Sequence, residues 1–312
     1  MSDRIQISEA SREGRGWWRT IRQRVTRART AFSLDRPASE PARIGLALGG
    51  GFARAIAHIG VLRVFERHKI PLHAISGVSA GAIVAAAYAA GADTDFIERI
   101  ARGMKFRDVA RWTVSLMGLA GSDRMIPFLG RLLKASKFEE MKIPLAIVAS
   151  DIASGAPVVF RGHGDVILPI RASCSYPGLF QPVRYNGACL VDGYVTTEVP
   201  VLPLRDMAAN RIIAVHLPGP AGGVDPRNLF AVMHRCFQVM GSRLEGEWRV
   251  HSDLVIAPAV EHVGWDSFTS ASEMIALGEK AAREAMPLVE QWLGRTPAVE
   301  RPAKSAPMRR LD

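Results

Sequence analysis

The sharpest chemical signal in the sequence is a serine flanked by glycines, Gly77-Val78-Ser79-Ala80-Gly81. It lies between a short stretch of strand length and an Ala-rich stretch of helical length. A serine at a tight strand-to-helix turn projects its hydroxyl out of the fold, and Gly77 and Gly81 would let strand and helix approach closely around it. The pattern predicts that Ser79 is a nucleophile. The competing interpretation is a chance match in a segment rich in Ala, Gly and Ser.

A second signal is the run Gly49-Gly50-Gly51, which follows a predicted strand and precedes Arg54. Backbone N–H groups at such a turn form a concavity for negative charge. Either a nucleotide phosphate or the oxyanion of an acyl-transfer intermediate would fit it. The nucleotide interpretation is weak because the chain has no G-x-x-x-x-G-K-[ST] motif. A purely structural turn is the third possibility.

An activated serine needs a base, which is usually histidine. Of the eight histidines, only His216, at the end of a predicted strand, has a suitable position, and His58 is expected to be packed within a helix. Asp192, which ends another predicted strand and is followed by Gly193, is also well placed to face a serine across a sheet. An ordinary Asp-Gly turn is the alternative there.

These residues require a fold that brings strand ends together. Apolar stretches of strand length occur at residues 43–48, 73–76, 145–150, 157–160, 212–217 and 253–257, and helical patterns at 52–69, 79–91, 226–248 and 270–293. Alternation of strands and helices indicates an α/β protein with a mostly parallel sheet. Two further short strands flank Asn186-Gly187, a dipeptide favoured in hairpin turns, so one antiparallel hairpin is expected.

Composition narrows the class of protein. The 312 residues are 48% hydrophobic, enough for a substantial core, and the net charge is +10. Residues 1–43 carry +5 and residues 294–312 carry +3, which leaves +2 for the middle and argues against a nucleic-acid groove.

The three cysteines form no C-x-x-C pair, so we expect a reducing compartment and no thiolate metal site. The uncharged segment 74–92 is poor in large apolar residues, which disfavours a spanning helix.

The N-terminal extension, residues 1–43, contains a pattern typical of a membrane-surface helix. Apolar residues recur at Trp17, Ile21, Val25, Ala28 and Phe32, and arginines stand largely outside this stripe at 19, 22, 24, 27 and 29. We expect residues 17–32 to bind an anionic membrane surface. A disordered arm, an arm docked on the core and an RNA-binding arm are the alternatives.

Four segments of the chain together resemble a known family. The stretch from Ile44 to Gly91, the segment RASCSYPGLFQPV at residues 171–183, the LVDG motif at 190–193 and DLVIAP at 253–258 are similar, in this order, to bacterial patatin-like phospholipases. The resemblance covers roughly residues 44–293. It implies a three-layer α/β fold with helices on both faces of a mostly parallel sheet, and it leaves residues 294–312 as a disordered tail.

The resemblance also implies a lipolytic acyl-ester hydrolase with a Ser-Asp dyad. Ser79 would be the nucleophile and Asp192 the base, without metal or cofactor. The amides of Gly50, Gly51 and Phe52 would form the oxyanion hole; the site-supporting residues would be Gly49, Arg54, Gly77, Gly81 and Gly193. The substrate would be a phospholipid or another acyl ester. We expect a cytoplasmic protein, peripheral at the inner face of the membrane, with no nucleic-acid partner.

Three residues depart from the family pattern. Phe52 stands where the family usually has a glycine or another small residue, Ala55 stands where it usually has a glycine, and Tyr194 follows Asp192-Gly193 where it has Gly or Ala. Phe52 and Tyr194 add bulk beside the predicted site. They keep open an alternative function, a membrane-recruited regulatory protein with a catalytically weak patatin-like fold.

Overall fold

The computed structural model describes residues 40–295 except 114, 116, 220–225, 227 and 265. The predicted arm at 17–32 and nearly all of the predicted tail lie outside this range. The strands are β1 (Ile44–Leu48), β2 (Leu72–Val78), β3 (Arg111–Trp112), β4 (Ala120–Gly121), β5 (Leu145–Asp151), β6 (Pro157–Arg161), β7 (Val183–Tyr185), β8 (Ala188–Asp192), β9 (Arg211–Val215) and β10 (Leu254–Ile256). The α-helices are α2 (Ala57–Arg67), α3 (Ala80–Ala89), α4 (Thr94–Gly103), α5 (Phe106–Val109), α6 (Met125–Leu132), α7 (Ile167–Ser173), α8 (Leu202–Asp206), α9 (Leu229–Val250) and α10 (Ala271–Trp292). Short 3₁₀ helices are η1 (Phe52–Ile56), η2 (Phe138–Glu140), η3 (Gly193–Val195) and η4 (Phe268–Ser270).

A central sheet organises the described chain. Its strands follow the order β10-β9-β1-β2-β5-β8-β7, with β6 also paired to β5. The pairs from β10 through β5 are parallel, whereas β6, β7 and β8 pair antiparallel to their neighbours. The predicted mostly parallel sheet and the Asn186-Gly187 hairpin are therefore confirmed. The strand predicted at 157–160 is β6, and it runs antiparallel.

The strand register around β5 brings the predicted catalytic residues together. β2 pairs with the first half of β5, where Val78 lies opposite Val148, and β8 pairs with the second half, where Asp192 lies opposite Ala149. β6 pairs with both Val148 and Ala149 from the opposite edge. β2 and β8 therefore share one edge of β5, run towards each other and meet end to end. Their carboxyl ends bring the residues after Val78 next to Asp192.

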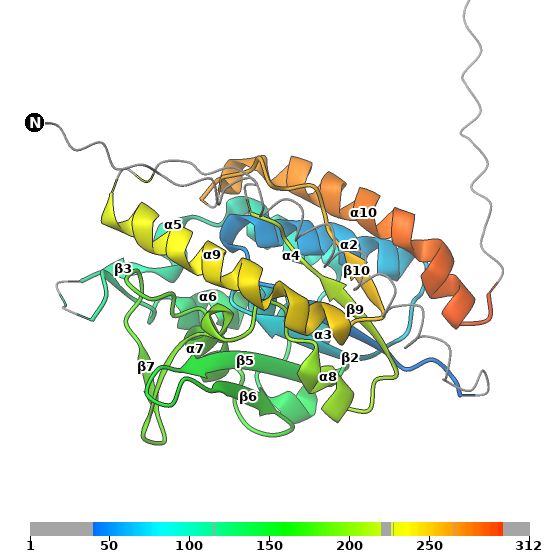
Figure 1. The fold of residues 1–312 in the computed structure, drawn as a ribbon, viewed down its shortest axis with the longest axis horizontal. Helices are drawn as coiled ribbons and strands as arrows, with labels where there is room; N and C mark the ends of the chain where they lie inside the picture. The colour runs from blue at the N-terminus through cyan, green and yellow to red at the C-terminus, as the bar shows by residue number, and fades with distance from the viewer. Residues whose placement is uncertain are drawn as a thin grey trace, which may run out of the picture.

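Helices cover both faces of the sheet, which confirms the predicted three-layer architecture (Figure 1). Side chains alternate between faces along a strand. On β1, Leu46 and Leu48 belong to a large core with α2, α3, α4 and α10, while Ala47 faces a smaller core that includes Leu204 of α8 and Trp248 of α9. α2 and α10 lie side by side over the larger core (Figure 1).

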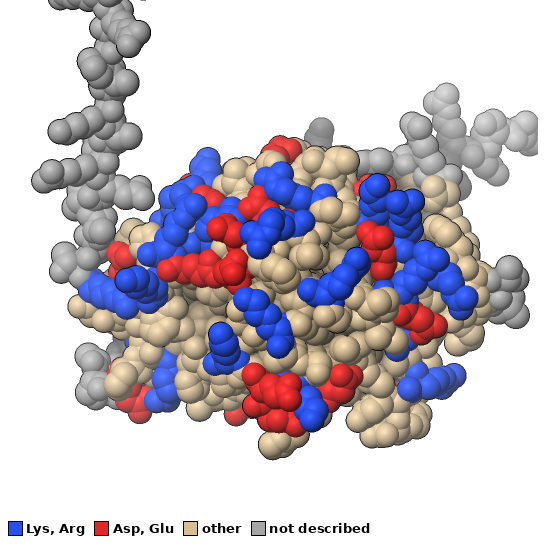
Figure 2. Space-filling view, turned by 180° about the vertical axis from the view of Figure 1, so that it is seen from behind, with Lys and Arg blue, Asp and Glu red and all other residues tan. Residues whose placement is uncertain are grey.

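The structure refines several predicted elements. The helix predicted at 52–69 begins as η1 and continues as α2, and the one predicted at 226–248 is α9, which begins at Leu229. The segment 74–92 comprises most of β2 and all of α3, both mainly buried. Among the described residues, no helix combines the length and the apolar character needed to cross a membrane. On the face opposite that of Figure 1, basic and acidic side chains are interspersed (Figure 2).

Candidate active site

Ser79 stands at a sharp turn between β2 and α3. Its backbone has φ 55° and ψ −132°, a strained conformation for a residue with a side chain. A Cβ built on Gly81 would lie 2.5 Å from the carbonyl oxygens of both Leu48 and Gly49, so only glycine fits there. Close packing of α3 on β1 thus depends on Gly81. Gly77 is buried and is the second-last residue of β2, two residues before the serine. The predicted strand–turn–helix geometry of the motif is present.

Asp192 lies directly beside Ser79. The Ser79 hydroxyl donates a hydrogen bond to Asp192 Oδ2, with 2.6 Å between the oxygens, and the Tyr194 N–H donates to Oδ1 at 2.9 Å. The carboxyl is almost wholly buried. Burial raises the pKa of Asp192 to about 7, although both hydrogen bonds act in the opposite direction. The Asp192 carboxyl group therefore titrates near neutral pH instead of at the usual acidic pKa of aspartate.

Gly193 allows this junction to close. A Cβ at position 193 would lie 2.1 Å from the Val148 carbonyl oxygen, where β2, β5 and β8 meet. The same oxygen accepts a hydrogen bond from Ser173 Oγ at 2.6 Å, and Ser173 Oγ accepts one from the Ser79 N–H at 2.8 Å. Ser173 is fully buried at the end of α7. It is a positioning residue that sequence reasoning did not identify, although it lies within the quoted RASCSYPGLFQPV segment.

The glycine turn lies against the serine. A Cβ on Gly50 would be 3.4 Å from Ser79 Cβ. The Gly49 N–H donates to Val215 O at 3.0 Å and the Gly50 N–H to Glu198 O at 3.3 Å, whereas the Gly51 N–H makes no hydrogen bond to another described residue. Of the predicted oxyanion-hole amides, the Gly50 amide is thus already engaged. Gly51 is better placed to donate to a bound oxyanion.

Two buried side chains hold this turn. His58 is fully buried and its Nε2–H donates to Gly49 O at 2.8 Å; burial lowers its pKa to about 4, so the ring is neutral at physiological pH. Arg54 is also buried, and its Nη1 donates to Pro218 O at 3.0 Å. Arg54 Nε has no hydrogen-bond partner among the described residues. The predicted packed role of His58 fits this contact, and Arg54 ties η1 to the segment after β9.

His216 is not placed as the base of Ser79. Its Nε2 lies 3.1 Å from Glu198 Oε1, and its ring packs against Trp248 at 5.2 Å between centroids. Glu198 also accepts hydrogen bonds from Trp248 Nε1 at 2.9 Å and from the Tyr194 hydroxyl at 3.3 Å. This cluster, which the sequence did not reveal, directs Tyr194 away from Asp192, so its bulk does not block the contact between serine and aspartate.

Ser79 and Asp192 open into a cavity of about 280 Å³ between the glycine turn and α9. Its lining is mixed: Arg54, Glu198, Arg235 and Gln238 are polar, and Phe52, Tyr176 and Phe237 are aromatic. His234 also lines it and contacts the Tyr176 hydroxyl at 3.0 Å. Among the described residues, no group of three or more His, Cys, Asp or Glu side chains is arranged to hold a metal ion.

The fold and the site define a class of protein. It is an α/β protein with a serine elbow, an adjoining glycine turn at residues 49–51 and a buried carboxylate at hydrogen-bonding distance from the serine hydroxyl. Residues 46–205, just over half of the chain, match the family model "Patatin-like phospholipase". The chain belongs to the patatin-like phospholipase family.

Individual comparisons agree with this assignment. An uncharacterised NTE family protein from Mycobacterium tuberculosis is 32% identical over 191 residues, 60% of this chain and 52% of the relative. A lysophospholipase NTE1 from Cryptococcus neoformans is 34% identical over 200 residues, 60% of this chain but 12% of the relative. The chain thus spans about half, or much less, of these relatives. VipD from Legionella pneumophila shares the fold, with a TM-score of 0.54 at 14% identity over 81% of this chain and 67% of VipD.

Proposed function

We propose that the protein is a serine hydrolase that cleaves carboxylic esters of lipids, of the phospholipase A or lysophospholipase type, through a Ser79–Asp192 dyad. One observation carries the proposal: the 2.6 Å hydrogen bond from the Ser79 hydroxyl to Asp192 Oδ2 at the floor of an open cavity. Family membership and the lysophospholipase relatives support lipid esters as the substrate class.

The geometry supports a two-step acyl transfer. Ser79 Oγ attacks the ester carbonyl carbon while its proton passes to Asp192 Oδ2, and the same carboxyl then protonates the leaving alkoxide. The amides of Gly51 and Phe52, with Gly50 beside them, would bind the oxyanion, and each such donor is worth about 3 kcal/mol elsewhere. Water activated by Asp192 attacks the acyl-serine, releases the fatty acid and restores the serine.

The raised pKa of Asp192 makes the proposal testable through pH. Only the deprotonated carboxyl accepts the serine proton, so kcat/KM for fatty-acid release from a lysophospholipid should rise about tenfold per pH unit below pH 7 and level off above it. Product mass spectrometry over pH 5–9 measures both the cleaved bond and the profile. A rate that is flat through this range contradicts Asp192 as the base.

The regulatory alternative makes a different prediction in the same assay. A patatin-like fold without useful turnover would release no fatty acid from any phospholipid or lysophospholipid at any pH. Phe52 and Tyr194 were the residues that favoured this alternative. Because Tyr194 points to Glu198 and the dyad contact is short, hydrolysis is the better-supported function.

We also propose that residues 17–32 hold the enzyme at an anionic membrane, with the protein in the cytoplasm at the inner face. Each basic residue near such a surface contributes about 1 kcal/mol, and tryptophan favours the interface. Deleting residues 1–42 should lower cosedimentation with anionic vesicles at least about tenfold, since five arginines are lost from residues 17–32 alone. Hydrolysis of a soluble ester should be unchanged. Equal vesicle binding by both forms at low salt contradicts the proposal.

A further inference from the structure

The Tyr194 ring lies between the glycine turn and α9 and packs against both. Tyr194 belongs to η3 and follows Asp192-Gly193, where the sequence departs from the family pattern. A Cβ built on Gly50 would lie 3.0 Å from Tyr194 Cδ2. A Cβ built on Gly241, a buried residue of α9, would lie 2.5 Å from the Tyr194 hydroxyl oxygen and 3.0 Å from Cζ. The ring therefore fills the space between two backbones, and each backbone has a glycine where it meets the ring.

Glu198 connects the three parts that meet at this ring. Its carboxylate accepts a hydrogen bond from the Tyr194 hydroxyl at 3.3 Å and one from Trp248 Nε1 of α9 at 2.9 Å. Its backbone oxygen accepts the Gly50 N–H at 3.3 Å. One buried residue thus binds the ring, the helix on one side of the ring and the turn on the other side.

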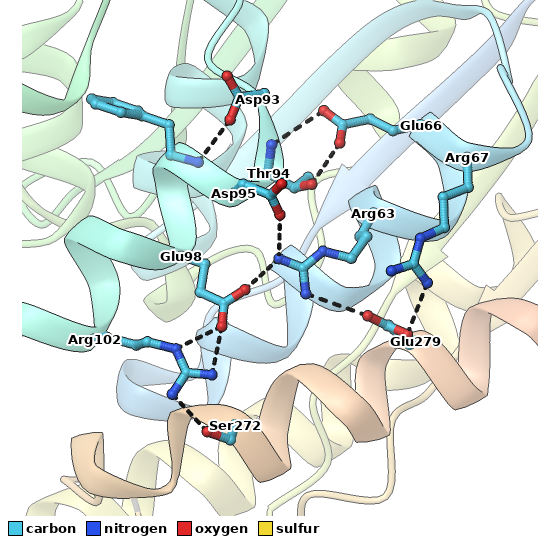
Figure 3. A network of polar contacts seen from close by, with 11 residues as sticks. Arg63, Glu66, Arg67, Asp93, Thr94, Asp95, Glu98, Arg102, Ser272 and Glu279 are labelled. Atoms are coloured by element: carbon cyan, nitrogen blue, oxygen red, sulfur yellow. Dashed lines mark hydrogen bonds and ion pairs between the residues drawn. The ribbon is translucent and has the colours of Figure 1, made fainter.

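The attachment of α9 differs from that of the helices over the larger core. There, α2, α4 and α10 are joined directly by charged side chains, since Arg63 of α2 pairs with Glu98 of α4 and, at 3.3 Å, with Glu279 of α10 (Figure 3). Trp248 of α9 instead donates to Glu198, which lines the catalytic cavity. The placement of α9 thus depends on contacts at the border of the site.

The same residue also adjoins the proposed catalytic groups. The Tyr194 N–H donates to Asp192 Oδ1 at 2.9 Å. Gly50, against which the ring packs, lies next to Ser79, because a Cβ built on it would be 3.4 Å from Ser79 Cβ. Oxyanion donors stabilise charge that develops only during the reaction, so their placement affects the transition state more than the bound ester.

We propose that Tyr194 is a positioning residue: its ring is the spacer that sets the distance between the glycine turn and α9 and so keeps the oxyanion donors in place. The inference rests on the proposed ester hydrolysis and adds to it the side chain that holds the donors. A misplacement of about 1 Å at a catalytic group can cost about 10²-fold in rate. Because the spacer acts through the turn, its loss lowers kcat and leaves the KM of a small ester nearly unchanged.

The test measures kcat and KM separately for p-nitrophenyl butyrate, with thermal melts to identify the folded variants. Tyr194→Ala removes the spacer, whereas Tyr194→Phe keeps the ring and removes only the hydroxyl. Gly241→Ala adds a methyl group 2.5 Å from the hydroxyl oxygen and pushes the ring towards the turn. Gly246→Ala is the matched control, because it is the same substitution in the same helix at an exposed position where an added Cβ meets no atom within 4 Å.

We expect Tyr194→Ala and Gly241→Ala each to lower kcat at least about tenfold, with KM within about threefold of wild type. Tyr194→Phe and Gly246→Ala should keep both constants within about threefold. The double variant Tyr194→Phe/Gly241→Ala should recover most of the kcat that Gly241→Ala loses, because the atom nearest to the added methyl group is then absent.

A folded Tyr194→Ala variant whose kcat stays within about threefold of wild type overturns the spacer role, as does a loss carried by KM alone. If Tyr194→Ala does not fold, the glycine variants decide. A Gly241→Ala variant no slower than Gly246→Ala, or a double variant without recovery, overturns the proposal. If the wild type does not hydrolyse the ester, the proposed function itself fails, and the spacer role fails with it.

Discussion

Replacing Asp192 with asparagine is expected to lower kcat/KM by about 10²–10⁴-fold and, at the same time, to stabilise the protein above pH 7. The loss of rate follows because an amide cannot accept the Ser79 proton. The gain in stability follows from burial. The folded-state pKa of about 7 lies above the usual value near 3.9 for aspartate, so ionisation of Asp192 favours the unfolded chain.

The sign of the pH dependence distinguishes this prediction from a general packing effect. Below about pH 4 Asp192 is protonated in both states, so wild type and Asp192→Asn should be similarly stable. As the pH rises from 4 to 7, the wild type loses stability relative to the variant. Above pH 7 the difference between their free energies of unfolding stays constant at about 2–4 kcal/mol. Urea denaturation at pH 4.5 and pH 8 measures the gap.

Asp151 provides a matched control on the same sheet. It ends β5, and it accepts hydrogen bonds from the Ser154 hydroxyl and the Cys189 N–H, which together with the Ala153 N–H lower its pKa. Asp151→Asn should therefore retain activity and should not be stabilised at pH 8. A rate for Asp192→Asn within about tenfold of wild type excludes Asp192 as the base. If Asp192→Asn has the same free energy of unfolding as the wild type at both pH values, the pKa of Asp192 is not raised in the folded protein.

The local part of the site could be predicted because it is encoded within a few residues. The serine elbow depends on Gly81 and on a strand and a helix that are adjacent in sequence, so the pattern at 77–81 was sufficient. The sequence alone left Asp192 and His216 both open as the base, and the choice between them came from the family resemblance. The contact with Asp192 spans 113 residues and depends on β2 and β8 sharing one edge of β5, a register that no local pattern specifies.

Residues that support the site through long-range contacts were missed for the same reason. Ser173 meets Ser79 across 94 residues, and Glu198 has hydrogen-bond partners in α9, in η3 and at His216, the residue that follows β9. The raised pKa of Asp192 is a consequence of burial and has no signature in sequence. One missed element did have a signal: the apolar residues at 97, 100, 101 and 104 follow the three- to four-residue spacing of a helix, and in the structure they line a hollow together with residues of α3 and α6.

Replacing Ser79 with alanine is expected to reduce ester hydrolysis by at least about 10⁴-fold, because no covalent acyl intermediate can form. Alanine removes only the hydroxyl, so the hydrogen bond from the backbone N–H of residue 79 to Ser173 Oγ can remain. A fluorophosphonate probe gives a second readout, since it labels only an activated serine. It should label the wild type at Ser79 and leave Ser79→Ala unlabelled.

Ser242 is the matched control, because it lines the same cavity but its hydroxyl donates to the backbone oxygen of Val239 at 2.8 Å and not to a carboxylate. Ser242→Ala should hydrolyse esters within about threefold of wild type and accept the probe at Ser79. The expected contrast between the two variants depends only on which serine has Asp192 as its hydrogen-bond acceptor. Turnover by Ser79→Ala above about one hundredth of the wild-type rate, or probe adducts at Ser242, would show that acyl transfer does not pass through Ser79.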